Sequence, residues 1–334
     1  MHKPFSTVFS ISRRRLGMAG LAACGVLGLP SLAWAQWPDR PLKFIVPFPP
    51  GGQTDTVARA LAVYLSKELE QPVIVDNKPG ANTSMGTMAL IRDPADGYSM
   101  EIVAGSTMVL NALLYPKLPY DVKRDLKLLS VVVDVPLIMV VPVDRPYKTV
   151  AEFVSYARAN PGKINFASVG VGSSLHLTGE LFADKAGLDM VHVPYKGSAA
   201  AMTEIIGGHV DVMFDAPSTA VPQVKAGKVR ALAVTSKDPV SFLPGIPTVN
   251  ETLPGFQTGV WYGVAVRPSV PDDVAQKLKA TIDKALQDPE LQKVFTEQGA
   301  ISHKPDTIAA HEAFMDDERK KWQALIGARK ITME

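Results

Sequence analysis

The sequence predicts an α/β protein of two lobes, each organised around a parallel, doubly wound sheet. The chain has 334 residues, which is more than one compact core usually absorbs. Segments typical of strands and of helices alternate along most of its length, and this pattern favours parallel sheets covered by helices. A long β-branched run, VVVDVPLIMVVPVDRPYKT, interrupts the alternation and is long enough to pass from one lobe to another.

The first set of alternating segments lies in residues 41–105. PLKFIVPF is typical of a strand, and the helix predicted after it, 54–69, has Val57, Leu61 and Leu65 at helical spacing. A strand and turn, VIVDNKPG, a helix around MGTMALIRD and a strand, YSMEIVAG, follow.

A second set follows the β-branched run. It comprises predicted helices at 149–160, 173–187, 198–208 and 218–227 and predicted strands at 164–169, 190–195, 210–217 and 229–236. A connector rich in proline and glycine, FLPGIPTVNETLPGFQTG, leads to a strand, WYGVAVRP, and to closing helices at 270–288 and 307–328.

These segments predict a first lobe that is interrupted by the second. We assign 37–141 and 255–334 to the first lobe and 142–254 to the second, after a leader at 1–35. Ligands are expected in the cleft between the lobes, at the carboxyl ends of the strands.

The leader has the order of a secretory signal. SRRRLG precedes an apolar run, and Ala33-Trp34-Ala35 is a small-residue cleavage site. The paired arginines indicate the twin-arginine route, and cleavage after Ala35 would place the protein in the periplasm. A membrane anchor is the alternative, but the run is short and contains glycines. Leu21-Ala22-Ala23-Cys24 also resembles a lipoprotein box, so acylation at Cys24 stays open.

Removing the leader changes the charge and the cysteine content. It carries four cations and no acid, so the formal net charge falls from +2 to −2. A nearly neutral protein is not expected to bind nucleic acid. Cys24 is the only cysteine, and the exported form would have no disulfide, thiol nucleophile or cysteine metal site.

Two glycine loops are candidates for anion binding. FIVPFPPGGQTDTVARAL has no lysine after its glycines, as a P-loop requires, and neither it nor SVGVGSSLHL has the dinucleotide-binding spacing. Glycine loops that open a helix can still direct N–H groups at an anion, helped by the helix dipole. Asp55 would repel an anion that it faced, so capping the helix is its favoured role.

Several motifs occur in one order: WPDRPLKFIVPFPPGGQTD, VIVDNKPGAN, DPADGYSM, LYPKLPYDVKRDL, HLTGELF, VHVPYKGSAAAMTEIIGGHVDVMFDAPSTAVPQVKAGKVRALAVTS and LPGF. In these motifs the chain resembles the Bug (TctC-like) family, the substrate-binding proteins of tripartite tricarboxylate transporters, over residues 37–334. The resemblance implies a two-lobed periplasmic-binding-protein fold of type II (Venus flytrap). It also implies a protein, expected to be monomeric, that closes on a small carboxylate without an enzymatic step and serves the membrane components of such a transporter.

The resemblance also implies that backbone and water grip the carboxylate between the two loops. The residues expected near the ligand are Phe48, Gly51, Gly52, Gln53, Thr54, Asp55, Thr107, Gly172, Ser173, Ser174, His176, Tyr195, Asp215 and Tyr262. For several of them a structural role is an open alternative: packing or capping for His176, a core position for either tyrosine, and loop hydrogen bonds for Asp215.

The chain departs from the family pattern at three places. Thr107-Met108 stands where Thr-His is frequent, Val171 replaces a polar residue, and Pro79-Gly80-Ala81-Asn82-Thr83 replaces a segment richer in glycine. Met108 and Val171 suggest a less polar pocket, and we therefore expect a carboxylate with an apolar portion, such as an aromatic acid.

Other functions are disfavoured by the sequence. A hydrolase using Ser173 or Ser174 with His176 lacks both G-x-S-x-G and S-x-x-K. No H-E-x-x-H links any of the six histidines, so neither a metal nor a cofactor is expected. A ligand-sensing protein that reports to a membrane sensor would have the same pocket, and this alternative stays open.

Overall fold

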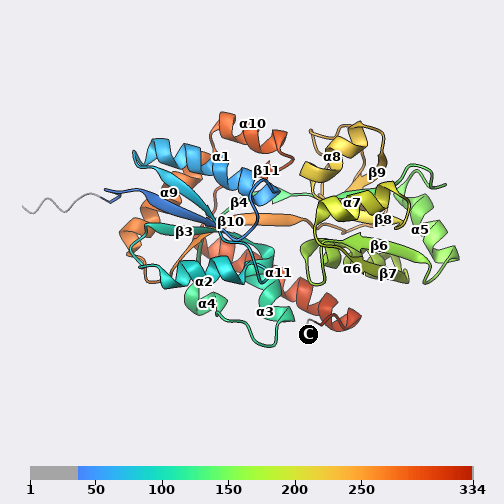
Figure 1. Cartoon of the computed structure of the whole chain (residues 1–334), viewed down its shortest axis with the longest axis horizontal. Coiled ribbons are helices and arrows are strands. Elements are labelled where there is room, and N and C mark those ends of the chain that lie inside the picture. Colours follow the sequence, from blue (N-terminus) through green and yellow to red (C-terminus); the bar gives the residue numbers. More distant parts are fainter. Residues whose placement is uncertain (1–36, 333–334) are drawn as a thin grey trace, which may run out of the picture. The chain divides into compact units, whose positions relative to one another are not determined.

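The computed structural model describes residues 37–332, so the predicted leader, its cleavage site and Cys24 lie outside the described residues. Two mixed sheets organise the described chain (Figure 1). We call the residues around the six-stranded sheet, of order β11-β4-β10-β3-β1-β2, the first lobe, and those around the five-stranded sheet, of order β7-β6-β8-β5-β9, the second lobe. The strands are β1 Leu42–Val46, β2 Val73–Asn77, β3 Ser99–Ala104, β4 Lys127–Val135, β5 Ile138–Pro142, β6 Ile164–Ser168, β7 Met190–Pro194, β8 Val212–Asp215, β9 Val229–Val234, β10 Val260–Val266 and β11 Ile301–Ser302.

The helices occupy most of the chain between these strands. They are α1 Gln53–Glu68, α2 Ser84–Arg92, the π-helical turn η1 Ser106–Leu110, α3 Asn111–Leu114, α4 Val122–Asp125, α5 Val150–Ala159, α6 Ser174–Ala186, α7 Ser198–Ile206, α8 Pro217–Lys225, the 3₁₀ turn η2 Val249–Glu251, α9 Asp272–Leu286, α10 Pro289–Glu297 and α11 Ile308–Arg329. The predicted alternation of strands and helices is therefore present in both lobes.

Helical periodicity explains how the first lobe is built. Val57, Leu61 and Leu65 form one buried face of α1, which packs in a common apolar cluster with Phe44 of β1 and with α9 and α10. On the opposite face, α2 packs against β1 and β3, and Leu90 is buried there. Both faces of the sheet are thus covered, as apolar strands such as β1 require.

The sheets are mixed, whereas the sequence analysis predicted parallel ones. Strands joined through helices are parallel: β1 with β2 and β3, and β6 with β7 and β8. However, β10 is antiparallel to β3 and β4, and β5 is antiparallel to β8 and β9. These two strands arrive from the other lobe and not through a covering helix, so they enter their sheets in the opposite direction.

The chain passes between the lobes twice. Pro136 and Leu137 join β4 to β5, and residues 235–259 join β9 to β10. The predicted division at 141/142 lies after the first passage, because the β-branched run is two strands broken at Pro136 and the second of them already belongs to the second lobe.

The last helix, α11, contacts both lobes. It packs against β4, η1 and α3 of the first lobe and against α6 of the second. Its Trp322 and Leu325 are buried in the same apolar cluster as Phe182 of α6. Within residues 37–332, no helix combines the length and the apolar character needed to cross a membrane.

Candidate ligand-binding site

A cavity of about 550 Å³ is lined by residues of both lobes. Its walls come from the loop after β1, the segment after β2, the end of β3 with η1, the loop between β6 and α6, and the start of β10. The lining residues are Pro47, Phe48, Pro49, Pro79, Gly80, Asn82, Thr83, Ala104, Ser106, Tyr115, Val169, Gly170, Val171, Ser173, Ser174, Leu175, Gly197, Val260 and Tyr262. The cavity therefore lies at the carboxyl ends of parallel strands, where ligands of open α/β sheets bind.

The first predicted loop is closed by Asp55. Its Oδ2 accepts hydrogen bonds from the Gly51 N–H at 2.8 Å and the Arg59 Nε at 2.9 Å, and its Oδ1 accepts one from the Asn77 Nδ2 at 2.9 Å. Burial alone would raise the pKa of Asp55, but these contacts hold it below its usual value. The carboxylate thus faces the protein, and the Gly51 amide is used inside the loop.

The start of α1 shows how the neighbouring predicted residues are placed. Gly52, and neither Thr54 nor Asp55, is the N-cap residue, and no side chain caps it. The Gln53 side chain donates to the Gln298 carbonyl at 2.9 Å. Thr54 is buried at the start of α1, and burial raises the pKa of Tyr262 to about 12 although the neighbouring Thr54 opposes the shift. Of the first-loop residues, Phe48 lines the cavity, and Tyr262 lines it from β10.

The second predicted loop is held from behind by its own helix. Ser173 caps α6 by accepting from the His176 N–H at 3.2 Å and donates its hydroxyl to the Gly170 carbonyl at 2.7 Å. The Gly172 N–H donates to the His176 Nδ1 at 3.1 Å. Ser174 and Leu175 are the first two residues of α6 and line the cavity. Since helical amides in the first turn have no partner within their helix, these two are available to a ligand.

The third wall is a strained segment after β2. Ala81, Asn82 and Thr83 have φ angles of 47°, 46° and 78°, in the left-handed region that disfavours side chains. Asn111 of α3 compensates: its Nδ2 donates to the Asn82 carbonyl at 2.7 Å, and its Oδ1 accepts from the Asn82 Nδ2 at 2.7 Å. The predicted ligand residue Thr107 is fully buried and donates to the Thr83 Oγ1 at 3.0 Å, so it supports this wall.

Asn111→Ala should release this segment and lower the free energy of unfolding by about 1–2 kcal/mol, because buried partners lose their hydrogen bonds. Urea denaturation would measure the change, and hydrogen exchange should show faster exchange in residues 80–84. Asn160→Ala is the matched control, since the Asn160 side chain bonds only a local carbonyl at an exposed position. Unchanged exchange in residues 80–84 would contradict this role of Asn111.

Two other predicted residues lie outside the lining. Asp215 is fully buried at the end of β8, where its Oδ1 accepts from the Ser198 hydroxyl at 2.7 Å. Burial raises the pKa of Asp215 to about 6 despite this hydrogen bond. Tyr195 is half-buried, and its amide donates to the Ser168 carbonyl at 2.9 Å. Asp215 thus holds the start of α7, next to the lining residue Gly197, whereas Tyr195 is held by β6.

The histidines do not activate either predicted serine. The rings of His176 and His192 stack with centroids 3.8 Å apart, and His176 reaches the Gly172 amide and not a serine hydroxyl. A serine–histidine contact does exist between Ser168 Oγ and His192 Nε2 at 2.6 Å. Ser168 is fully buried, however, and its hydroxyl also contacts the backbone of Gly170, so a substrate cannot reach it.

The residues that line the candidate cavity are mostly apolar, and their polar groups are hydroxyl and amide groups. Among the described residues that line the cavity there is no Asp, Glu, Lys, Arg or His.

Val171 lines the cavity as expected, but Met108 is buried in the first lobe and lines a different cavity, beside α11. Met108 therefore carries no information on the ligand. Tyr115 is a lining residue that the sequence analysis missed, and Asn82 is one that it named only within a departure from the family pattern.

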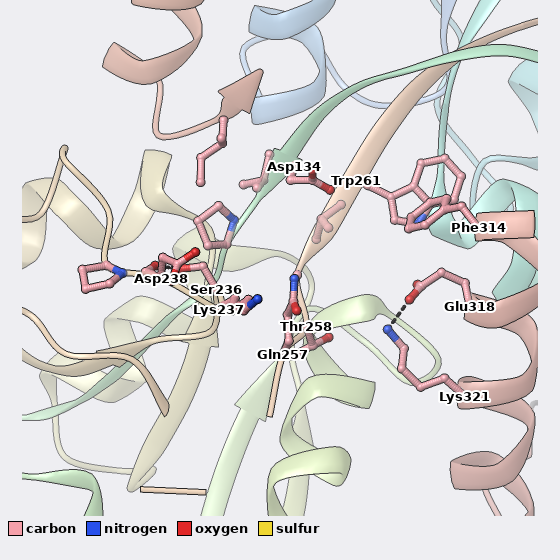
Figure 2. A pocket seen from close by; sticks show the side chains of 16 residues that line it. Asp134, Ser236, Lys237, Asp238, Gln257, Thr258, Trp261, Phe314, Glu318 and Lys321 are labelled. Atoms are coloured by element: carbon pink, nitrogen blue, oxygen red, sulfur yellow. Dashed lines mark hydrogen bonds and ion pairs between the residues drawn. The ribbon is translucent and has the colours of Figure 1, made fainter. Parts of the chain in front are cut away.

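A second cavity of about 640 Å³ lies at the two passages between the lobes. Figure 2 shows Asp134 and Trp261 near the passages, and the ion pair of Glu318 with Lys321 on α11. This cavity includes residues of both connections. It contains none of the predicted site residues, so the cavity at the strand ends is the candidate ligand site.

Comparisons with known proteins support this choice. A family model described as "Tripartite tricarboxylate transporter family receptor" (TctC) matches residues 57–331. Protein BugT of Bordetella pertussis is 34% identical over 294 residues, which cover 87% of this chain and 89% of BugT.

Two solved structures are similar in fold and contain carboxylates. An R. palustris protein with adipate has a TM-score of 0.80 at 30% identity, covering 89% of this chain and 99% of that one. MatC from Rhodopseudomonas palustris with bound malate has a TM-score of 0.75 at 28% identity, covering 87% and 100%.

Proposed function

This chain belongs to the tripartite tricarboxylate transporter receptor family, and we propose that it captures a small carboxylate in the interlobe cavity and delivers it to the membrane components of a tripartite transporter. The family match and the relative BugT agree with the resemblance to the Bug family that the motifs carried. The observation on which the proposal depends most is the cavity itself, which has helix starts and hydroxyl groups but no ionisable Asp, Glu, Lys, Arg or His among its described lining residues.

The proposed grip on the carboxylate uses backbone amides. Ser174 and Leu175 open α6, where the first amides lack partners and the helix dipole favours negative charge. Gly197, which precedes α7, brings a second helix start to the same cavity. An anion can therefore bind here without an arginine or a lysine. A cation is disfavoured, because the positive ends of both helix dipoles face the cavity.

The proposed body of the ligand is apolar. Phe48, Tyr115, Val171, Val260 and Tyr262 supply aromatic and aliphatic surface around the amides. A second carboxylate at the far end would find hydroxyl and amide groups but no cationic side chain. We therefore infer a carboxylate with an apolar body, either an aromatic acid or a longer dicarboxylate such as the adipate bound by the R. palustris relative.

A thermal-shift panel tests this function. Adipate, benzoate and malate would be compared with adipamide and 1,6-diaminohexane, which lack the carboxylates. We expect adipate or benzoate to raise the melting temperature, since ligand at a hundred times its Kd stabilises the folded state by about 2.7 kcal/mol. A shift by malate alone would contradict the apolar body, and a shift by the diamine would contradict anion binding.

We also propose that the protein is exported and that its lobes close on the ligand. Export is supported by the secretory pattern of residues 1–35, and closure by a cavity that residues of both lobes line and by the two passages of the chain that join these lobes. Mass spectrometry of the secreted form should find Gln36 at the N-terminus, and an acylated Cys24 would overturn cleavage after Ala35.

A further inference from the structure

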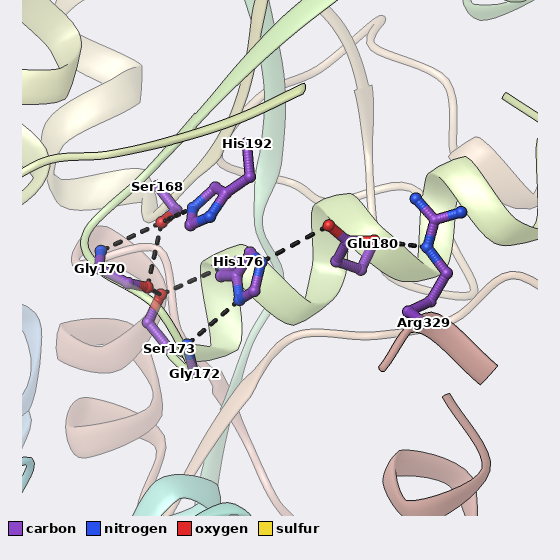
Figure 3. A network of polar contacts seen from close by, with 8 residues as sticks. All are labelled: Ser168, Gly170, Gly172, Ser173, His176, Glu180, His192 and Arg329. Atoms are coloured by element: carbon purple, nitrogen blue, oxygen red, sulfur yellow. Dashed lines mark hydrogen bonds and ion pairs between the residues drawn. The ribbon is translucent and has the colours of Figure 1, made fainter. Parts of the chain in front are cut away.

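A chain of polar contacts connects the ligand loop to the end of the last helix (Figure 3). The Gly172 N–H donates to His176 Nδ1 at 3.1 Å. On the other side of the ring, His176 Nε2 lies 3.6 Å from Glu180 Oε1. Glu180 Oε2 in turn accepts a hydrogen bond from Arg329 Nε at 2.6 Å. Four residues thus connect the loop that lines the cavity with the last residue of α11.

These contacts select one tautomer of His176. Because Gly172 donates to Nδ1, that nitrogen carries no proton, and the proton of the neutral ring is on Nε2. Nε2 faces the Glu180 carboxylate, which stabilises a proton at this position. Burial alone would raise the pKa of Glu180, but its contacts with His176 and Arg329 hold it below its usual value, so the carboxylate stays charged.

Packing holds the plane of the His176 ring. It lies parallel to Phe166, with an interplanar angle of 7°, and stacks on His192 at a centroid distance of 3.8 Å. Burial, together with the neighbouring His176, lowers the pKa of His192 to about 4, so His192 is neutral at pH 7. Two titratable side chains therefore face His176: Glu180 on its own helix and His192 on β7. Arg329 of α11 lies on the other side of Glu180.

Arg329 enters this chain from an element that is anchored in the first lobe. α11 packs against β4, η1 and α3 of the first lobe, and its last residue, Arg329, reaches Glu180 of α6 in the second lobe. Glu180 is 8% exposed, and within residues 37–332 Arg329 is the only arginine or lysine that hydrogen bonds to it. Its compensating charge therefore comes from the helix that connects the lobes.

We propose that Arg329 is a positioning residue of the ligand loop: through Glu180 it fixes His176 as the Nε2-protonated tautomer, whose Nδ1 holds the Gly172 amide away from the cavity. The loop then presents Ser174 and Leu175, and not Gly172, to a ligand. This role matters for ligand binding only if the proposed function holds, on which it rests. The contacts themselves can be tested without any ligand.

The test is ¹⁵N NMR on the protein labelled in histidine, glycine and leucine, for the wild type, Arg329→Gln and Arg319→Gln. Arg319 is the matched control, because it lies on the same helix and pairs with Asp316 of that helix. The two ring nitrogens of His176 report its tautomer, and hydrogen exchange of the Gly172 amide reports the loop contact. The amide of Leu177, which bonds within α6, reports general stability of the helix.

In the wild type at pH 7.5 we expect widely separated ring ¹⁵N shifts for His176 and a protected Gly172 amide. Arg329→Gln should bring the two shifts together and accelerate Gly172 exchange by about five- to tenfold, the loss of one hydrogen bond, while Leu177 changes little. Arg319→Gln should resemble the wild type. Equal behaviour of the two variants, or an equal acceleration at Gly172 and Leu177, would overturn the proposal.

An adipate titration of the same samples separates this proposal from the proposed function. Weaker adipate binding in Arg329→Gln than in Arg319→Gln would extend the role of Arg329 to the ligand. If adipate binds none of the three proteins, the ligand assignment fails, whereas the NMR result still decides whether Arg329 positions the loop.

Discussion

Ser174→Pro should weaken carboxylate binding by about 1.5–3 kcal/mol, or roughly 10- to 150-fold, because it removes a hydrogen bond to a charged group. Ser174 is the first residue of α6 and lines the cavity, and proline lacks the amide that we assign to the ligand. Isothermal titration with adipate, or with whichever carboxylate gives the largest thermal shift, measures the effect.

The fold should tolerate this substitution. Proline is favoured at the first position of a helix, where its missing N–H has no helical partner. The residue before a proline must be extended, and Ser173 already has φ −69° and ψ 155°. The melting temperature of the unliganded variant should therefore stay close to that of the wild type.

Ser174→Ala is the matched control for this experiment. It removes the hydroxyl but keeps the amide, so it should cost clearly less affinity than the proline variant. If the alanine variant loses as much affinity as the proline variant, the hydroxyl and not the amide holds the carboxylate.

Glu101→Gln should make the protein more stable at neutral and alkaline pH. Glu101 is fully buried in β3, where its Oε1 accepts from the Thr87 hydroxyl at 2.9 Å and its Oε2 has no partner among the described residues. Burial raises the pKa of Glu101 to about 8, although Thr87 opposes the shift. The folded protein therefore holds a proton that the unfolded chain releases above its usual pKa of 4.5.

The sign follows from proton binding. Between pH 4.5 and 8 the folded state binds more protons than the unfolded state, so stability falls as pH rises. This group alone should contribute a slope of about 1.4 kcal/mol per pH unit, or roughly 3 kcal/mol between pH 4.5 and 7. Glutamine imitates the protonated acid and removes this slope.

Urea denaturation at pH 5, 6, 7 and 8 measures the effect. The two proteins should have similar stability at pH 5, and the advantage of Glu101→Gln should grow to about 2–4 kcal/mol at pH 8. Glu297→Gln on the exposed side of α10 is the control, and it should follow the wild type at every pH. Parallel stability curves for wild type and Glu101→Gln would show that Glu101 is charged in the folded protein.

The sequence predicted individual strands, turns and helices better than it predicted the contacts between them. The strand, glycine turn and helix around 44–61 were predicted because periodicity and glycine act over a few residues. The hydrogen bond from the Gly51 amide to Asp55 was not predicted. It depends on which side of the turn the Asp55 carboxylate faces, and hydrophobic periodicity does not specify this. The start of α10 could have been predicted, since Asp288 followed by proline is a helix-start signal. Asp288 does cap this helix, and its Oδ1 accepts a hydrogen bond from the Leu291 N–H at 2.8 Å.

The candidate site was predicted in its location and only partly in its members. Ser173, Ser174, Phe48 and Tyr262 line the cavity, and three of them are in or next to glycine loops. Asn82 was named only as part of a departure from the family pattern, and the contacts with Asn111 that hold it join positions 29 residues apart. Tyr115 was missed because no local pattern marks it as a lining residue. The position of Met108 was inferred from the family pattern, in which a histidine is frequent there, and this pattern does not show that α11 lies beside Met108.

A cavity without charged lining residues also determines how capture responds to the surroundings. Attraction between full charges weakens as mobile ions gather around them, over about 10 Å at 0.1 M salt. Fixed amide dipoles at the starts of α6 and α7 act over only the first turn of each helix, close to a bound anion. A cavity of this kind should therefore meet anions more slowly than a positively charged cleft would, and the rate of encounter should depend less on the salt concentration.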